Sequence, residues 1–326
     1  AWAKNDVTLI NANMERYGYD NFSGWFGPAG FKGGPFGPNI GVGQIKEGSP
    51  ADGKLLVGDI IYSANGKMVG EESWLVMAEA ITESETREGN GKLVLGVRRG
   101  SENIDVELTL AVMGTYSSTA PYDCPKTEKI IDNLLNWIVS GASKESRRTD
   151  FLGSDTLFLL ATGNPETLGF ARRTIYNKIT NTKIVDEIDP TSGSKRAWHH
   201  AWDALLLGEY YMATGDRNVL PYLKYHCDQL AARQHEVGGW RHNYPGGSGY
   251  GLIPAIGLPA AIGFNLANAA GLDISQEAYR KVVNYYHDGQ AEMGRVVYGV
   301  TASTPAPPEF KPDALQNGLM RTANGA

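Results

Sequence analysis

The stretch that most limits how this chain can fold is residues 40–67, where strand-like runs alternate with turn signals. Ile40–Ile45 is rich in β-branched residues, and the Gly-Ser-Pro-Ala sequence at 48–51 interrupts it. A second apolar run, Ile60–Tyr62, precedes Asn65-Gly66, a pair that favours positive φ and predicts a tight turn. This pattern predicts a small β-sheet near the start of the chain.

A helix and two more strands are expected to complete this sheet region. Four apolar residues recur at the spacing of one helical face: Trp74, Met77, Ala78 and Ile81. Residues 93–99 form another strand-like run, and 104–110 alternate apolar and polar side chains as a half-buried strand does. We therefore expect a partly open sheet with one long helix beside an edge strand.

The order of these motifs over residues 25–113 resembles a PDZ domain. The resemblance implies that a peptide or an extended protein segment binds as an added strand between an edge strand and the helix. It also implies a glycine-rich loop whose backbone N–H groups bind a carboxylate. The candidate peptide-binding residues are Gly27, Pro28, Ala29, Gly30, Phe31 and Lys32. Their order departs from the common Gly-Leu-Gly-Phe form, and the alternative interpretation is that these glycines only form turns. A groove closed by the chain's own segment 24–37 would count against peptide binding.

Composition excludes several classes of function. The chain has 326 residues, 42% of them hydrophobic, and a formal net charge of −6. Because no basic run is longer than two residues, we do not expect nucleic acid as a partner. No stretch of about 18 apolar residues is present, so we expect no membrane span. The sequence indicates no cofactor and no metal site.

Helical periodicity begins after a Ser-, Thr- and Pro-containing segment at 114–127, which we interpret as a linker. Helices are expected over 150–162, 165–180, 197–213, 218–234, 254–270 and 275–288. Gly163, Gly215 and Gly271 each follow an apolar helix and are expected to end it in a left-handed conformation. Their spacings of 52 and 56 residues fit repeated helical hairpins. The expected organisation is 1–24 N-terminal segment, 25–113 PDZ-like domain, 114–127 linker, 128–300 helical-hairpin domain and 301–326 Pro/Ala-rich tail.

One motif favours an α/α toroid for the helical part. Gln234, Gly238 and Trp240, with Leu230 four residues before the glutamine, resemble the repeat motif of terpene cyclases. The implied role is structural, with the glutamine amide bonded to backbone at a helix end. The acidic signatures of terpene chemistry are absent from the sequence. Because few hairpins are visible, the toroid-like domain is expected to be incomplete, and the fold class is α+β.

Three short motifs follow the PDZ-like unit along the chain, at residues 112–116 (Val-Met-Gly-Thr-Tyr), 120–126 (Ala-Pro-Tyr-Asp-Cys-Pro-Lys) and 238–243 (Gly-Gly-Trp-Arg-His-Asn). This order resembles a bacterial exported family of unknown function that joins a PDZ-like domain to an α/α-toroid-like domain. The resemblance implies export, to the periplasm or the extracellular space. The first functional hypothesis is PDZ-type binding of a peptide or extended protein segment by the sheet domain.

The alternative hypothesis is a carbohydrate-active enzyme, a polysaccharide lyase or glycoside hydrolase, with its site in the toroid and a polysaccharide as partner. The candidate catalytic residues are His199, Asp203, His242 and Tyr250. His199 and Asp203 are four residues apart, so they share a helical face and could act as a general base and its orienting carboxylate. An alternative is that Asp203 only satisfies a partly buried histidine. Since no protease motif is present, a lyase or glycosidase is favoured over a protease.

Overall fold

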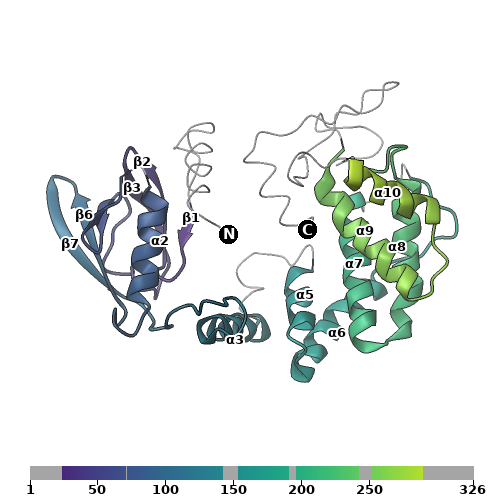
Figure 1. Ribbon diagram of the computed structural model, residues 1–326, viewed down its shortest axis with the longest axis horizontal. Helices are drawn as coiled ribbons and strands as arrows, with labels where there is room; N and C mark the ends of the chain where they lie inside the picture. The colour runs from purple at the N-terminus through teal and green to yellow at the C-terminus, as the bar shows by residue number, and fades with distance from the viewer. Residues whose placement is uncertain (1–23, 71, 142–152, 191–195, 242–251, 289–326) are drawn as a thin grey trace. The chain divides into compact units, whose positions relative to one another are not determined.

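The structure is a computed structural model of the 326-residue chain. It describes residues 24–70, 72–141, 153–190, 196–241 and 252–288. The chain divides into two compact units, Ala1–Leu134 and Leu135–Ala326, which we call the sheet unit and the helical unit. The described residues confirm the α+β class, since an antiparallel sheet precedes a run of helices (Figure 1).

The sheet unit contains a single open antiparallel sheet among its described residues. Its strands are β1 (Gly24–Phe26), β2 (Phe31–Phe36), β3 (Asn39–Ile45), β4 (Ile60–Ala64), β5 (Lys67–Met68), β6 (Lys92–Arg99) and β7 (Glu102–Thr109). The order is β1-β2-β3-β4-β6-β7, with β5 paired to β4, so β1 and β7 are the two edges. Helix α2 (Ser73–Ser84) contacts β4 and β6.

The turn and helix signals of this region are confirmed in most details. Asn65 and Gly66 have φ values of +46° and +79° and connect β4 to β5. Helix α2 buries Met77 and Ile81 as predicted. The prediction for Ala78 was wrong: this residue is exposed, and Ala80 lies in the core instead. Small alanines give little periodic signal, so the edge of an apolar helical face is poorly defined by them.

A β-hairpin occupies residues 24–36, where the sequence indicated only a glycine-rich loop. Strands β1 and β2 pair antiparallel, and the turn between them is residues 27–30. Phe31 and Lys32, placed in the loop by the sequence interpretation, are the first residues of β2. Glycine and proline disfavour strands, which hid this hairpin from a propensity argument.

The segment after β7 is bonded to the end of α2. The backbone N–H groups of Met113 and Gly114 donate to the Glu85 carbonyl, at 2.9 and 2.8 Å. The carboxylate of Glu85 forms an ion pair with Lys126 at 2.6 Å, and the Lys126 side chain is 1% exposed. Lys126 Nζ also lies 4.5 Å from the centre of the Tyr116 ring. These contacts hold the segment 113–126 against the C-terminal end of α2 within the sheet unit.

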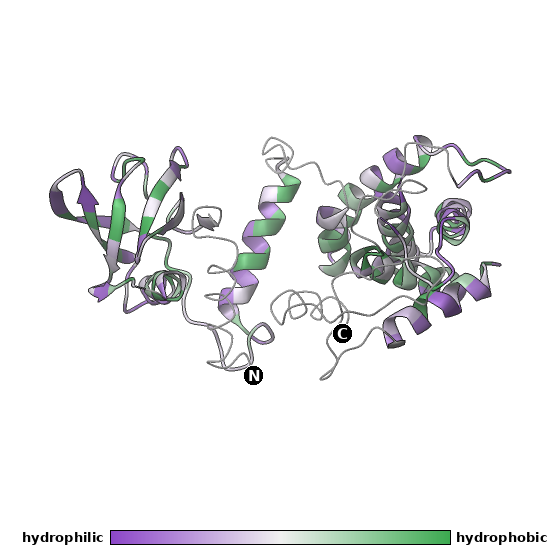
Figure 2. Cartoon of the chain, turned by 90° about the horizontal axis from the view of Figure 1, so that it is seen from above, coloured by the Kyte–Doolittle hydropathy of each residue, from purple (hydrophilic) through white to green (hydrophobic). Residues whose placement is uncertain are grey.

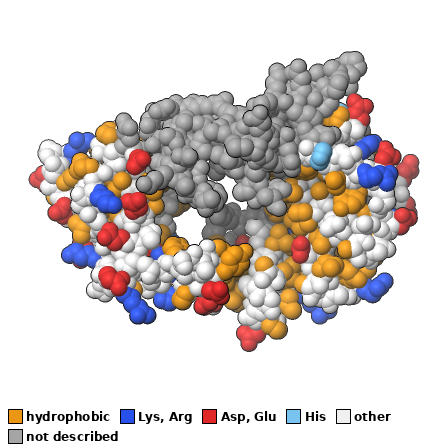
Figure 3. All heavy atoms as spheres, in the orientation of Figure 1, with side chains coloured by type: hydrophobic (Ala, Val, Ile, Leu, Met, Phe, Trp, Pro, Cys, Tyr) orange, Lys and Arg blue, Asp and Glu red, His pale blue; other side chains and the backbone are white. Residues whose placement is uncertain are grey.

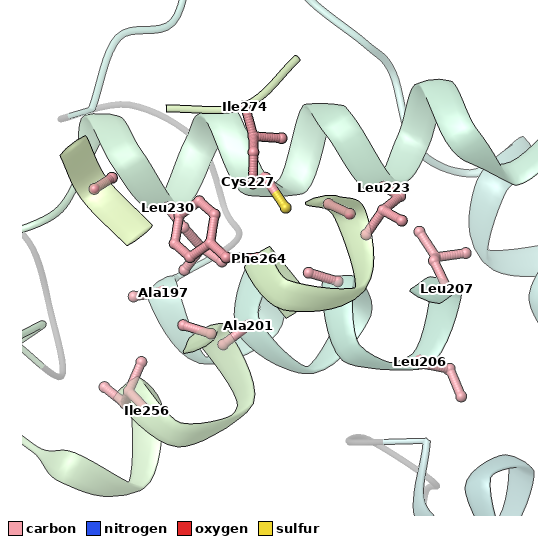
Figure 4. Packing of buried hydrophobic residues seen from close by; sticks show 14 of the residues in the cluster. Ala197, Ala201, Leu206, Leu207, Leu223, Cys227, Leu230, Ile256, Phe264 and Ile274 are labelled. Carbon is pink, nitrogen blue, oxygen red and sulfur yellow. The ribbon is translucent and has the colours of Figure 1, made fainter. Parts of the chain in front are cut away.

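Helices make up most of the described chain after the sheet. They are α3 (Pro125–Val139), which crosses the boundary between the units, then α5 (Ser154–Ala161), α6 (Pro165–Thr180), α7 (Ala197–Thr214), a 3-10 turn η2 (Arg217–Val219), α8 (Leu220–Ala232), α9 (Pro254–Ala269) and α10 (Gln276–Asp288). These bounds agree closely with the predicted helices. Helix α7 packs against both α8 and α9. Their buried side chains, among them Leu223, Cys227 and Phe264, meet in one hydrophobic core (Figure 4).

The two sequence signals for helical hairpins both have the expected structural roles. Gly163, Gly215 and Gly271 have φ values of +62°, +70° and +74°, so each adopts the left-handed conformation after a helix. Gln234 Nε2 donates to the carbonyls of Gly238 and Ala278, at 3.0 and 2.9 Å. The glutamine therefore joins the end of α8 to α10, which explains its presence without any catalytic role.

The surface differs between the two units. Hydrophobic residues recur along α3 among polar ones (Figure 2), and Ile130, Ile131, Leu134 and Trp137 of this helix are exposed. On the face seen in Figure 3, acidic and basic side chains are interspersed over the sheet unit. Hydrophobic side chains are frequent on the helical unit in the same view. The charge on the described part of this face is mixed rather than basic.

Candidate functional site

The first candidate site is the set of residues in β2 and α2 that bind strand β1, which we call the β1 site. Gly24, Trp25 and Phe26 lie opposite Gly33, Lys32 and Phe31 in an antiparallel ladder. On its other side β2 pairs with β3 along its whole length. Strand β1 thus adds to the outer edge of the sheet as a three-residue strand. Residues 24–26 of the chain itself therefore occupy the edge that peptide binding requires to be free, which counts against simple peptide capture and means that a ligand must displace β1.

An aromatic cluster binds the end of β1. The Phe26 ring is stacked on Trp74 of α2, with ring centres 4.6 Å apart and planes inclined by 15°. It also lies 4.8 Å from the ring of Phe31 on β2. Phe26 and Phe31 are both buried, whereas Trp25 between the ladder partners is 52% exposed. Alternate side chains of β1 therefore point toward α2 and toward solvent, as in any half-buried strand.

The turn at 27–30 uses its backbone N–H groups within the hairpin. Ala29 and Gly30 both donate to the Phe26 carbonyl, at N···O distances of 3.0 and 2.8 Å. Gly27 and Pro28 are exposed at the tip of the turn, and Ala29 and Gly30 are buried. The amides that the sequence interpretation assigned to a carboxylate thus surround a carbonyl oxygen of the chain itself. A carboxylate would bind there by replacing that oxygen.

The second candidate site is a buried group of ionisable side chains from three helices of the helical unit. The Nδ1 atoms of His200 (α7) and His226 (α8) lie 2.9 Å apart. Asp203 on α7 accepts from Lys178 of α6 at 3.0 Å, and its other oxygen lies 3.7 Å from His226 Nε2. His200, His226 and Asp203 are all at most 6% exposed. We call these four residues the histidine cluster.

Further polar residues of α8 continue from the histidine cluster. The Tyr225 ring packs edge-on against His226, with ring centres 5.3 Å apart. Arg233 is buried and donates to the carbonyl and the side-chain oxygen of Gln229. Burial lowers the pKa of the Arg233 guanidinium, against the opposing influence of Tyr225 and Asp189. Buried polar side chains therefore recur over about two turns of α8, beside its apolar core residues.

Protonation limits what the histidine cluster can do. Only one proton fits between the facing Nδ1 atoms, because two N–H groups cannot point at each other at 2.9 Å. Asp203, positioned by Lys178, lies on the opposite side of the His226 ring. Both nitrogens of the buried His226 ring thus face side chains of α7, His200 at 2.9 Å and Asp203 at 3.7 Å.

Comparison with protein families assigns the helical part of the chain. A family model described as a domain of unknown function (DUF6288) matches residues 127–310, more than half of the chain. The chain belongs to this family. No curated protein and no solved structure matches it. The histidine cluster lies within the DUF6288 domain, whereas the β1 site lies before it.

The four residues predicted to be catalytic are not seen as one group in the structure. His199 Nδ1 accepts from the backbone N–H of Arg196 at 3.0 Å, which satisfies a donor at the start of α7. Asp203 lies in the histidine cluster with His226 and Lys178. His242 and Tyr250 lie outside the described residues.

Sequence reasoning missed Lys178 and His226 and chose His199 over its neighbour His200. A usable signal was present in α8, where His226, Gln229 and Arg233 recur at intervals of three and four residues. At that spacing the three polar side chains lie on the same helical face as Leu230, which is a buried residue of the hydrophobic core. A polar stripe on an apolar helical face indicates a buried network.

Two further properties concern metals and membranes. Within the ranges that the structure describes, no three His, Cys, Asp or Glu residues are grouped so that they could bind a metal ion. None of the described helices combines the length and the apolar character needed to cross a bilayer.

The two cysteines of the chain, Cys124 and Cys227, are both buried free thiols.

Proposed function

We propose that the sheet unit binds a peptide or extended protein segment as an added β-strand at the β1 site, in the manner of a PDZ domain. One observation carries this proposal: β2 and Trp74 already bind a three-residue strand, β1, through a backbone ladder and an aromatic anchor. Strand addition obtains affinity from main-chain hydrogen bonds and selectivity from alternate side chains. The β1 site provides both.

The direction of β1 predicts the direction of the bound peptide. Strand β1 runs antiparallel to β2 and ends at the turn 27–30. A peptide in the same orientation places its C-terminal carboxylate beside the N–H groups of Ala29 and Gly30. Hydrogen bonds to an ionised carboxylate are about twice as strong as those to a neutral carbonyl. A free C-terminus therefore competes well with the Phe26 carbonyl for these two donors.

A peptide array probed with the full chain tests this function. The wild-type protein is expected to select peptides with free C-termini over the same peptides with amidated ends. Trp74→Ala should weaken binding about tenfold or more, since a central aromatic contact is removed. Trp137→Ala, which removes an exposed tryptophan of α3, is the matched control and should bind as wild type does. Equal binding by both variants would exclude the β1 site.

We further propose that this protein is an exported bacterial protein, as the resemblance of its motif order implies. The two free thiols neither require nor oppose an oxidising compartment. Fractionation of cells that express the native gene, with antibody detection, tests this. Recovery in the cytoplasmic fraction alone would contradict export.

A second function, a carbohydrate-active enzyme with a toroid-like DUF6288 domain, is supported by the histidine cluster. Abstraction of a proton beside a uronate carboxylate needs a base with an oriented partner, and His226 with Asp203, 3.7 Å apart, supplies a histidine and a carboxylate that a shift of a few tenths of an ångström would bring into hydrogen-bond range. A polysaccharide panel should be read in parallel for unsaturated products, by ultraviolet absorbance, and for new reducing ends. His226→Gln should abolish any activity found, whereas Lys224→Met in the same helix should retain it. Activity that survives His226→Gln would remove the cluster from consideration.

A further inference from the structure

Strand β1 makes each kind of contact that a bound peptide would make at the β1 site. It pairs with Phe31–Gly33 through its backbone. Its last side chain, Phe26, is stacked on Trp74 and packs at a tilt against Phe31. Its last carbonyl accepts from Ala29 and Gly30, where a terminal carboxylate would accept. Strand β1 therefore occupies the β1 site with the contacts expected of a bound peptide.

The side chains of β1 define which residues the site accepts. A Cβ atom added to Gly24 would lie 3.1 Å from the Trp74 ring, so a small residue is required at this position. Trp25 is 52% exposed, so the middle position is unrestricted by the site. Phe26 is 6% exposed within the aromatic cluster, so the last position requires an aromatic side chain. The resulting pattern is small, any, aromatic.

We propose that β1 is a tethered ligand mimic, and that the true ligand is an extended segment ending in a small residue, any residue and a C-terminal aromatic residue. This inference rests on the proposed peptide-binding function. It adds the chemistry of the ligand and the requirement that β1 leaves the site before the ligand binds.

Tethering determines how strongly β1 competes. Because only the four-residue turn 27–30 separates β1 from β2, the effective concentration of β1 at the site is of millimolar order or higher. An external peptide binds only to the fraction of molecules in which β1 is displaced, and its apparent affinity falls by that fraction. The wild-type protein is therefore expected to bind weakly, and weakening β1 should strengthen binding.

The first experiment measures binding of one peptide to two full-length proteins by isothermal titration calorimetry. The probe is the hexapeptide of residues 21–26, Asn-Phe-Ser-Gly-Trp-Phe, with a free C-terminus. Phe26→Ala removes the anchor of the tethered strand, so the probe should bind this variant about tenfold or more tighter than wild type. A control peptide ending in Ala should gain nothing. Equal affinity of the probe for both proteins overturns the inference.

A second variant keeps the proposal testable if Phe26→Ala fails to fold. Trp25 and Lys32 lie directly opposite each other in the ladder, so Trp25→Cys combined with Lys32→Cys can form a cross-strand disulfide. The oxidised protein should lose probe binding, and reduction should restore it. The native thiols, Cys124 and Cys227, are both buried.

The outcomes separate this inference from the proposed function. If the oxidised double variant binds the probe as well as the reduced one, β1 is not a competitor, and the tethered-mimic inference is wrong. Peptide binding that remains sensitive to Trp74→Ala would then still support the proposed function. If no variant binds any peptide of the array or the probe, both proposals fall.

Discussion

Substitution of Gly30 by alanine provides the sharpest test of the turn that connects β1 to β2. Gly30 has a φ of +79°, and an added Cβ would lie 2.1 Å from Ser49 Cβ. Rotation of the Ser49 side chain cannot relieve this contact, because the backbone fixes the position of Cβ; the Ser49 Oγ also donates to the Gly30 carbonyl at 3.1 Å. The same carbonyl accepts from Lys46 N–H at 2.9 Å. Alanine is thus expected to disturb both the turn and the segment packed on it.

The expected cost is the sum of two effects. Positive φ costs alanine about 1 kcal/mol relative to glycine, and the forced displacement of a packed neighbour costs about 2 kcal/mol. A loss of about 3 kcal/mol should accelerate exchange of the most protected sheet amides about a hundredfold, since 1.4 kcal/mol is a factor of ten. Hydrogen exchange with mass spectrometry on the full chain, read on peptides from Lys92–Thr109, measures this without interference from the helical unit.

Gly27→Ala is the matched control in the same turn. Gly27 does not have positive φ, and an added Cβ would meet nothing within 4 Å. Exchange in the β6–β7 peptides should therefore stay within a factor of about three of wild type. Equal exchange in the two variants, whether both fast or both slow, would refute the reasoning from backbone conformation and close approach.

Three more predictions follow from the ionisable groups. Lys126→Met should destabilise the sheet unit by about 3 kcal/mol, because Glu85 would keep a buried charge without its partner, and urea denaturation should show it. Asp203→Asn should destabilise the helical unit by about 2 kcal/mol and accelerate amide exchange in α7 and α8. The ultraviolet absorbance of the Cys124 thiolate should rise with pH through a midpoint near pH 6, because hydrogen bonds from the Thr127 side chain and the Ser117 N–H lower the pKa of this buried thiol to about 6.

Each of these predictions has an internal comparison. The Lys67–Glu79 pair is exposed, so Lys67→Met should lower the free energy of unfolding by less than about 1 kcal/mol. An equally small loss in Lys126→Met would contradict the argument that burial makes the Lys126–Glu85 pair important. Sheet peptides should exchange normally in Asp203→Asn, and faster exchange there would indicate a general defect. Burial raises the pKa of Cys227, so Cys227→Ala should keep the thiolate absorbance near neutral pH and Cys124→Ser should lose it; a signal that survives Cys124→Ser would refute the local cause.

The sequence predicted most of the helical unit because its signals are local. Helix bounds follow from apolar spacing, and the helix ends follow from Gly163, Gly215 and Gly271, whose left-handed conformations need no knowledge of distant residues. The same holds for the Asn65-Gly66 turn in the sheet unit. Features that depend on one or two neighbouring residues were therefore predicted correctly.

The histidine cluster was only partly predictable, since its members are brought together by tertiary contacts. Asp203 was selected because it shares a helical face with His199, yet the structure places it beside Lys178, 25 positions earlier, and His226. Pairings across three helices require the packing angles of α6, α7 and α8, which no spacing rule supplies. What the sequence does contain is the polar stripe on α8.

The hairpin of β1 and β2 shows why a binding edge can escape notice in a sequence. Strand β2 contains Gly33, Gly34 and Pro35, all disfavoured in strands. Gly33 is needed there because an added Cβ would lie 2.7 Å from Ile40 Cγ2. The hairpin therefore gains little from strand propensity, and the aromatic contacts of Phe26 must supply much of its stability. A strand stabilised mainly by one side chain is one that a ligand bearing the same side chain can replace.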